Sequence, residues 1–154
     1  MNDEFFMQKA IELSRSAVLH GNEPFGAVLV KNGEIVFSNE NQIYTRNDPT
    51  FHAEAGLIRL FCAETELTDL SDYTLYASCE PCFMCSGAMV WVNLGRLVYA
   101  AGNDDLEAIL GSEGCSSSAL VFEHSFRHPE VTAGVLREES LIVLRDYFSA
   151  HVKG

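Results

Sequence analysis

The sequence predicts one α/β domain that spans residues 1–154, and three observations support this fold class. Helix-like and strand-like segments alternate along the chain. The 154 residues suit one domain with a single hydrophobic core. A helix is expected between the third and fourth strands, so these two strands should run parallel. We find no repeat, low-complexity tract or linker that would divide the chain.

The N-terminal third gives the clearest signals. Residues 4–20 carry apolar side chains at helical spacing and end in a Gly-Asn stop, which predicts an amphipathic helix. The β-rich runs 25–30 and 34–38 follow this helix. They are joined through Asn32-Gly33, and an Asn-Gly turn between two such runs favours a β-hairpin.

The middle of the chain predicts a loop, a helix, a strand, a helix and a strand, in that order. The loop is inferred from its polar residues, and the second helix from Pro81, because proline is favoured in the first helical turn. The predicted ranges are a loop over 39–51, a helix from His52 to about Ala63, a strand over 74–77, a helix from Pro81 to Val92 and a strand over 96–101.

The last third carries weaker patterns. Residues 102–135 are rich in Gly, Ser, Asp and Glu, with one apolar patch at 119–122. A short fifth strand is expected near 132–136. A last helix is expected over 137–151, where apolar residues share one face.

Charge and hydropathy indicate a cytoplasmic protein with a small substrate. No apolar run approaches the roughly 20 residues that cross a bilayer, and the acidic N-terminus is unlike a signal peptide. Ten basic against 22 acidic residues give a net charge of −12. The basic residues are scattered, whereas proteins that bind long polyanions cluster them. We therefore expect a small, uncharged substrate and neither a nucleic-acid nor a membrane partner.

Two motifs carry the chemistry, His52-Ala53-Glu54 and Pro81-Cys82-Phe83-Met84-Cys85. Each is expected at a helix start, where free N–H groups and the helix dipole stabilise thiolates. Two cysteines at this spacing can direct both sulfurs at one ion, and the histidine completes a His/Cys/Cys set for Zn²⁺. Three protein ligands leave the fourth tetrahedral position to water, as in catalytic zinc sites. Zinc lowers the pKa of such a water to about 7.

Glu54 follows the ligand His52 by two residues, and on a helix such neighbours point to different sides. We therefore expect Glu54 to lie beside the metal as a proton shuttle. It would take a proton from the water, deliver it to a ring nitrogen and help the amine leave as ammonia. The spacing H-x-E…P-C-x-x-C is a known signature of zinc deaminases, so it predicts hydrolytic deamination.

A Cys-x-x-Cys pair also occurs in redox proteins and in structural zinc sites. A redox pair does not need His-x-Glu about 30 residues earlier, and the chain has no second Cys-x-x-Cys to complete a four-sulfur site. An odd count of five cysteines argues against a disulfide framework. The other cysteines are expected to be small core residues: Cys62, Cys79 and Cys115.

With these motifs the chain resembles the cytidine deaminase-like superfamily, in its purine-acting branch. The resemblance covers residues 24–101 and includes the segments 24–30, 47–50 and 75–76 beside the two motifs. It implies a three-layer α/β/α sandwich with a five-stranded mixed sheet and bound zinc. It also implies assembly as a homodimer or a higher oligomer.

The resemblance to bacterial guanine deaminases implies several substrate contacts. Asn41 is expected to hydrogen-bond the base, and Phe25 and Trp91 are expected to help pack the pocket. Ala53, inside the first motif, is a further expected contact. The guanine enzymes carry an acidic residue after the fourth strand, and Glu113 is the position here that could supply this carboxylate.

The resemblance and the charge together favour deamination of a free purine or purine-like base, guanine first. A tRNA-specific adenosine deaminase is the alternative, because residues 127–136 and the helix after them are similar to those enzymes. A non-catalytic zinc-binding partner subunit is the alternative from another class, although such a subunit has no use for Glu54. The exact ring, and whether nucleosides are accepted, stay open at this point.

Overall fold

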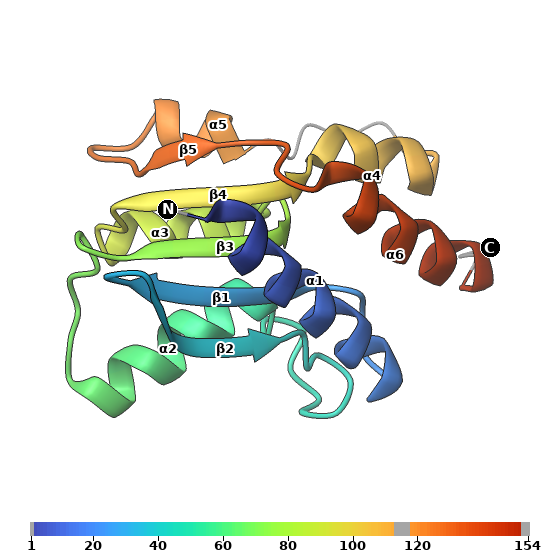
Figure 1. The fold of residues 1–154 in the computed structure, drawn as a ribbon, viewed down its shortest axis with the longest axis horizontal. Helices are drawn as coiled ribbons and strands as arrows, with labels where there is room; N and C mark the ends of the chain where they lie inside the picture. Colours follow the sequence, from blue (N-terminus) through green and yellow to red (C-terminus); the bar gives the residue numbers. More distant parts are fainter. Residues whose placement is uncertain (1, 113–117, 152–154) are drawn as a thin grey trace.

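The computed structural model describes residues 2–112 and 118–151 (Figure 1). Its centre is one sheet with the strand order β2-β1-β3-β4-β5. β1 pairs antiparallel with β2 and β3, whereas β3, β4 and β5 are parallel. The mixed five-stranded sheet is therefore confirmed. The elements are α1 (Asp3–Leu19), β1 (Gly26–Lys31), β2 (Glu34–Glu40), α2 (Ala53–Thr65), β3 (Thr74–Cys79), α3 (Phe83–Trp91), β4 (Arg96–Ala101), α4 (Asn103–Leu110), α5 (Ser118–Glu123), β5 (Glu130–Thr132) and α6 (Arg137–Ala150).

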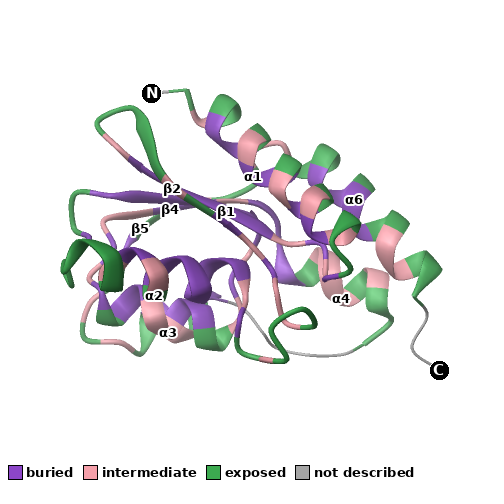
Figure 2. Ribbon diagram, turned by 90° about the horizontal axis from the view of Figure 1, so that it is seen from below, coloured by how far each residue is buried: buried purple, intermediate pink, exposed green. Residues whose placement is uncertain are grey.

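Helices cover both faces of the sheet, which gives the fold three layers (Figure 2). On one face, α1 packs on β1 and β3, and α6 packs on β4 and against α1. On the other face, α2 packs on β1 and β2 and beside α3, and α5 packs against α3. The structure thus confirms the α/β/α sandwich, and it brings the N-termini of α2 and α3 together on one side of the sheet.

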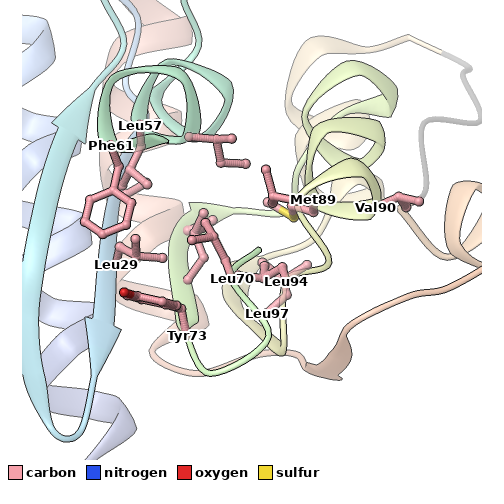
Figure 3. Close-up of a cluster of buried hydrophobic side chains, with 14 of the residues drawn as sticks. Leu29, Leu57, Phe61, Leu70, Tyr73, Met89, Val90, Leu94 and Leu97 are labelled. Carbon is pink, nitrogen blue, oxygen red and sulfur yellow. The ribbon is translucent and has the colours of Figure 1, made fainter. Parts of the chain in front are cut away.

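Because both faces are covered, β1 and β3 are almost continuously buried. The core beneath α2 and α3 joins aliphatic and aromatic side chains from the sheet and both helices, among them Leu29, Leu57, Phe61, Met89 and Leu97 (Figure 3). A second core lies beneath α1 on the opposite face. Removal of this apolar surface from water is the main stabilising term of such a fold, at about 25 cal/mol per Å².

The helix α1 is fixed to the sheet near its middle and at its N-terminus. A Cβ at Gly26 would lie 2.3 Å from the carbonyl oxygen of Ala10, so only glycine lets α1 approach β1 this closely. At the N-terminus of α1, Arg96 of β4 donates two hydrogen bonds of 2.9 and 2.8 Å to the carboxylate of Asp3. The hydroxyl of Tyr76 donates a third, at 2.6 Å.

The structure differs from the sequence expectations mainly after β4. Two helices, α4 and α5, form within residues 102–135, where the composition indicates no helix. The strand β5 covers Glu130–Thr132 and therefore precedes most of the expected range. Pro81 lies outside α3, just before the N-cap Cys82, so that helix begins later than expected. Within the described ranges, no helix combines the length and the apolarity needed to cross a bilayer.

Candidate active site

The two sequence motifs meet where two neighbouring helices begin. His52 is the N-cap of α2 and Cys82 is the N-cap of α3. Cys85 lies in the first turn of α3 and is fully buried. The Nδ1 atom of His52 lies 3.5 Å from Cys82 Sγ and 3.7 Å from Cys85 Sγ. All three ligand atoms lie within 4.8 Å of one another, the one such cluster found in the part of the chain that the structure describes.

A tetrahedral zinc ion fits these spacings. Zn–N bonds of about 2.0–2.1 Å and Zn–S bonds of about 2.3 Å place nitrogen and sulfur ligands about 3.5 Å apart. The measured separations of 3.5 and 3.7 Å agree with this value. His52, Cys82 and Cys85 can therefore hold one ion without rearrangement, and the fourth position remains for water or substrate.

The cluster stabilises a negative charge on sulfur. A hydrogen bond from the Cys85 thiol, followed by the contact with His52, lowers the pKa of Cys82 to about 4. The same bond and burial raise the pKa of Cys85 well above its ordinary value. The hydrogen bond with Cys82 also raises the pKa of His52, against the effect of burial. A thiolate at a helix N-terminus is the form that coordinates a divalent cation.

Glu54, the second residue of α2, is buried beside this cluster. Burial, and then the charge of the Cys82 thiolate, raises the pKa of its carboxyl to about 7. Among the described residues, only its own backbone N–H donates to this carboxylate. A buried carboxyl that titrates near neutrality beside a metal-ligand cluster is suited to proton transfer.

Asn41 lies directly after β2 and is 2 % exposed. Its backbone N–H donates to the carbonyl of Phe25 at 3.0 Å, and its Oδ1 accepts from the N–H of Ile43 at 3.2 Å. The side-chain oxygen is thus engaged by the loop, whereas no described residue accepts from Nδ2. This amide group has contact with accessible space, and it can therefore donate a hydrogen bond to a ligand.

Phe25 lies on the wall of a cavity of about 970 Å³ between the segment before β1, α4 and α6. Apolar side chains from α4 and α6 form much of the remaining wall, including Leu106, Ile109, Leu141 and Phe148. Phe25 also packs against the core beneath α2 and α3. Phe25 therefore links the cavity to the core beneath the ligand cluster, whereas the three ligands and Glu54 do not themselves line the cavity.

Ala53 precedes Glu54 at the start of α2 and is fully buried. Its carbonyl accepts a hydrogen bond of 3.0 Å from Asn39 Nδ2. A Cβ at Gly56, one turn further on, would lie 2.8 Å from that same amide nitrogen. Asn39 therefore holds the first turn of α2, and with it Glu54, against β2.

Trp91 does not line this cavity in the described structure. Trp91 ends α3, is 74 % exposed and contacts the ring of Phe126 at 5.7 Å between centroids. Within one chain Trp91 therefore lies on the surface and does not pack the pocket, because α3 carries it away from the ligand turn. Glu113 lies outside the described residues, so its role stays a prediction.

Glu80, which follows β3, accepts hydrogen bonds from the starts of two later helices. Its Oε1 accepts from the N–H of Asn103 at 3.0 Å. Its Oε2 accepts from the N–H of Ser118 at 2.8 Å and from the Ser118 hydroxyl at 2.5 Å. Glu80 thus joins the ligand turn to the starts of α4 and α5. These partners lie 23 and 38 residues away, so no local pattern indicates them.

The fold, the His/Cys/Cys cluster and the adjoining acid define the class of zinc-dependent deaminases. Residues 1–101 match the model of the family described as the cytidine and deoxycytidylate deaminase zinc-binding region. The match covers about two-thirds of the chain, and the chain belongs to this family. It is accordingly a zinc-dependent nucleobase or nucleoside deaminase.

Curated relatives of two kinds are similar to the chain. The guanine deaminase of Bacillus subtilis (strain 168) is 44 % identical over 106 residues, which cover 68 % of each chain. The tRNA-specific adenosine deaminase of the same organism is 36 % identical over 149 residues, 95 % of this chain and 88 % of the relative.

Solved structures give the same pair of functions. The guanine deaminase of Nitrosomonas europaea superposes with a TM-score of 0.83 at 31 % identity, over 95 % of this chain and 84 % of that one. A mutant of the protein NE0047 in complex with 8-azaguanine has a TM-score of 0.85 at 30 % identity, over 96 % and 85 %. A tRNA:A34 deaminase has a TM-score of 0.77 at 31 % identity, over 90 % and 98 %.

Proposed function

We propose that the chain is an aminohydrolase for a free purine or purine-like base, with guanine as the first candidate. The observation that carries the proposal is the buried carboxyl of Glu54 beside the His52, Cys82 and Cys85 cluster. The guanine deaminases among the relatives, and the 8-azaguanine bound to a similar structure, support the substrate class. A net charge of −12 favours an uncharged ring over a polyanion.

In the proposed reaction, His52, Cys82 and Cys85 hold zinc, which when bound supplies Lewis acidity that activates a water molecule. Glu54 accepts the proton of this water and passes it to a ring nitrogen while the water oxygen adds to the amino-bearing carbon. Glu54 then takes the remaining proton from the added hydroxyl and passes it to the amino group, which leaves as ammonia while the carbon–oxygen double bond forms. The raised pKa of Glu54 suits a group that both accepts and donates protons near neutral pH.

The remaining contacts orient the ring. Asn41 presents Nδ2 as a donor to a ring acceptor, since its Oδ1 is held by the loop. Phe25 offers an apolar face to the ring, and Ala53 lies between the ligand His52 and Glu54. We propose Glu113 as an acidic contact on the basis of its sequence position alone.

The exposed apolar side chains of α3, of α5 and of the turn after α5 support a homodimer. They lie on or next to two helices that contact each other, and monomeric proteins rarely expose large apolar patches. A second copy on this face would cover the ring of Trp91, which is largely exposed within one chain. We name these exposed apolar side chains the α3–α5 patch: Phe83, Met84, Trp91, Leu120 and Phe126. We also propose a cytoplasmic location.

The second candidate is a tRNA-specific adenosine deaminase, because such a relative matches 95 % of the chain. The two functions differ in their response to salt. Binding of an RNA stem-loop weakens steeply as salt rises, whereas turnover of a free base is almost independent of salt.

The experiment is an ammonia-release screen of the zinc-loaded protein. Substrates are guanine, adenine, isoguanine and cytosine with their nucleosides, pterins, aminotriazines and an adenosine-containing anticodon stem-loop. We expect the highest kcat/KM for a free purine or purine-like base, with little effect of salt. Deamination of the stem-loop alone, lost at high salt, would establish the second candidate.

A further inference from the structure

Glu23 is a carboxylate on the wall of the 970 Å³ cavity, on the same segment as Phe25. A tight turn fixes its place, since the N–H of Phe25 donates to the Glu23 carbonyl at 2.9 Å. Pro24 between them is buried. The carboxylate is partly buried, and none of the ion pairs among the described residues includes it.

Groups from three parts of the molecule lie within the electrostatic reach of Glu23. The hydroxyl of Tyr44, in the loop after β2, points at Glu23 Oε2 from 3.5 Å. The negative charge of Glu23 raises the pKa of Tyr44. Burial is the main cause of the raised pKa of Tyr147 in α6, and the charge of Glu23 adds to it. The same charge is one of those that act on the ligand His52. Glu23 therefore lies between the loop of Asn41, the C-terminal part of α6 and the metal cluster.

The other charged side chains of the cavity interact with one another: Asp105, Arg137 and Arg145. Arg137 is engaged by Asp105 through hydrogen bonds of 3.0 and 2.5 Å. Arg145 lines the cavity from α6 and also acts on Asp105. Glu23 is thus the cavity carboxylate that no cation engages among the described residues. In a largely apolar cavity such an acceptor gains most from an N–H donor on a ligand.

We propose that Glu23 is a specificity-determining residue that accepts a hydrogen bond from an N–H group on the six-membered ring other than the amino group that is replaced. This proposal rests on the proposed deamination of a free base. It narrows the substrate class to aminoheterocycles whose six-membered ring carries a second N–H donor besides the amino group that is replaced. A ring without that donor leaves the carboxylate unpaired, and sites built around a hydrogen bond reject such analogues.

The test uses three purines that share the 2-amino group. Guanine and 2,6-diaminopurine carry a further donor on the six-membered ring, whereas 2-aminopurine does not. For each ring, kcat/KM is measured with the zinc-loaded wild type, Glu23→Gln and Glu34→Gln. Glu34 is an exposed hairpin carboxylate outside the cavity, so its variant removes the same charge elsewhere. Zinc content is measured for all three proteins.

We expect Glu23→Gln to lower kcat/KM about tenfold for guanine and 2,6-diaminopurine, because the carboxamide removes the charged acceptor of this partly buried hydrogen bond. 2-Aminopurine should change less than about twofold, and Glu34→Gln should match wild type. An equal loss on all three rings, or no loss on any, would overturn the proposal.

Binding of the same rings is measured by calorimetry on Glu54→Ala, alone and combined with Glu23→Gln. If the wild type releases no ammonia from any base, the proposed function fails. Glu23 is then judged by affinity, and the same selective weakening for guanine and 2,6-diaminopurine supports it. Equal affinities with and without Glu23→Gln refute it.

Discussion

At the scale of single residues, the ligands and the acid could be predicted from the sequence because they form short contiguous motifs. The spacing of His52, Cys82 and Cys85 reflects two helix starts, and the structure brings these starts together. Substrate contacts are less predictable, since their roles depend on where distant segments meet. Glu23 faces groups from α6 and the loop after β2, a placement that no local pattern encodes.

The ligand set is tested by metal content. Cys82→Ala removes the sulfur whose pKa lies near 4, and with it the thiolate that attracts the cation. We expect zinc to fall from one ion per chain to a small fraction, as measured by elemental analysis after gel filtration. Cys62→Ala is the control, because this half-buried cysteine of α2 lies outside the cluster. Full zinc content in Cys82→Ala would refute the ligand assignment.

At the scale of elements, local patterns predict the segments up to β4, because α1 carries apolar residues at helical spacing and Asn32-Gly33 marks the hairpin. The segment after β4 is held instead by specific polar contacts. The N–H of Gly102 donates to Asp105 at the start of α4, and Glu80 joins α4 and α5 to the ligand turn. Such contacts leave no repeat in the sequence, so α4 and α5 are missed and the position of β5 is expected too late.

Glu80→Gln tests the role of this carboxylate in holding α4 and α5. A carboxamide offers one acceptor oxygen, so either Asn103 or Ser118 loses its partner. We expect a loss of about 1–3 kcal/mol in the free energy of unfolding, as measured by urea denaturation. The control Asp104→Asn, an exposed residue of the same region, should cost under about 1 kcal/mol. Equal stability of both variants would contradict this role.

At the scale of the whole molecule, two features extend beyond the site. The ion pair between Asp3 and Arg96 joins the N-terminus of α1 to β4 of the sheet. The α3–α5 patch leaves aromatic side chains exposed on the opposite layer. Composition indicates neither feature, because a net charge of −12 says nothing about which carboxylate is paired or which apolar side chain is uncovered.

The Asp3 link predicts a dependence of stability on pH. The hydrogen bonds from Arg96 hold the pKa of Asp3 below its ordinary value of 3.8. The carboxylate therefore contributes stability above about pH 4, and this contribution is lost as the pH falls through the lowered pKa. Asp3→Asn should cost about 1–2 kcal/mol at pH 7, with the difference closing below pH 4, in urea unfolding. A constant difference across this range would contradict the pairing.

The α3–α5 patch predicts a dimer that depends on aromatic contacts. The double variant Trp91→Ser with Phe126→Ser removes the two most exposed rings of the patch. We expect sedimentation velocity to show a dimer for the wild type and a monomer for the variant. The control Ile142→Ser changes an exposed apolar residue of α6 and should remain dimeric. A monomeric wild type would remove the basis for the homodimer.

We propose that zinc activates the water molecule and that Glu54 transfers the protons. The variant Glu54→Gln tests this division of roles most directly. The variant keeps the shape of the side chain but removes the carboxyl that transfers protons. Zinc content and ammonia release are measured on the same preparations, with the best free base from the screen. We expect wild-type zinc content and a fall in kcat of at least about 100-fold, the usual contribution of general acid–base catalysis. A zinc-loaded Glu54→Gln that turns over near the wild-type rate would contradict the mechanism.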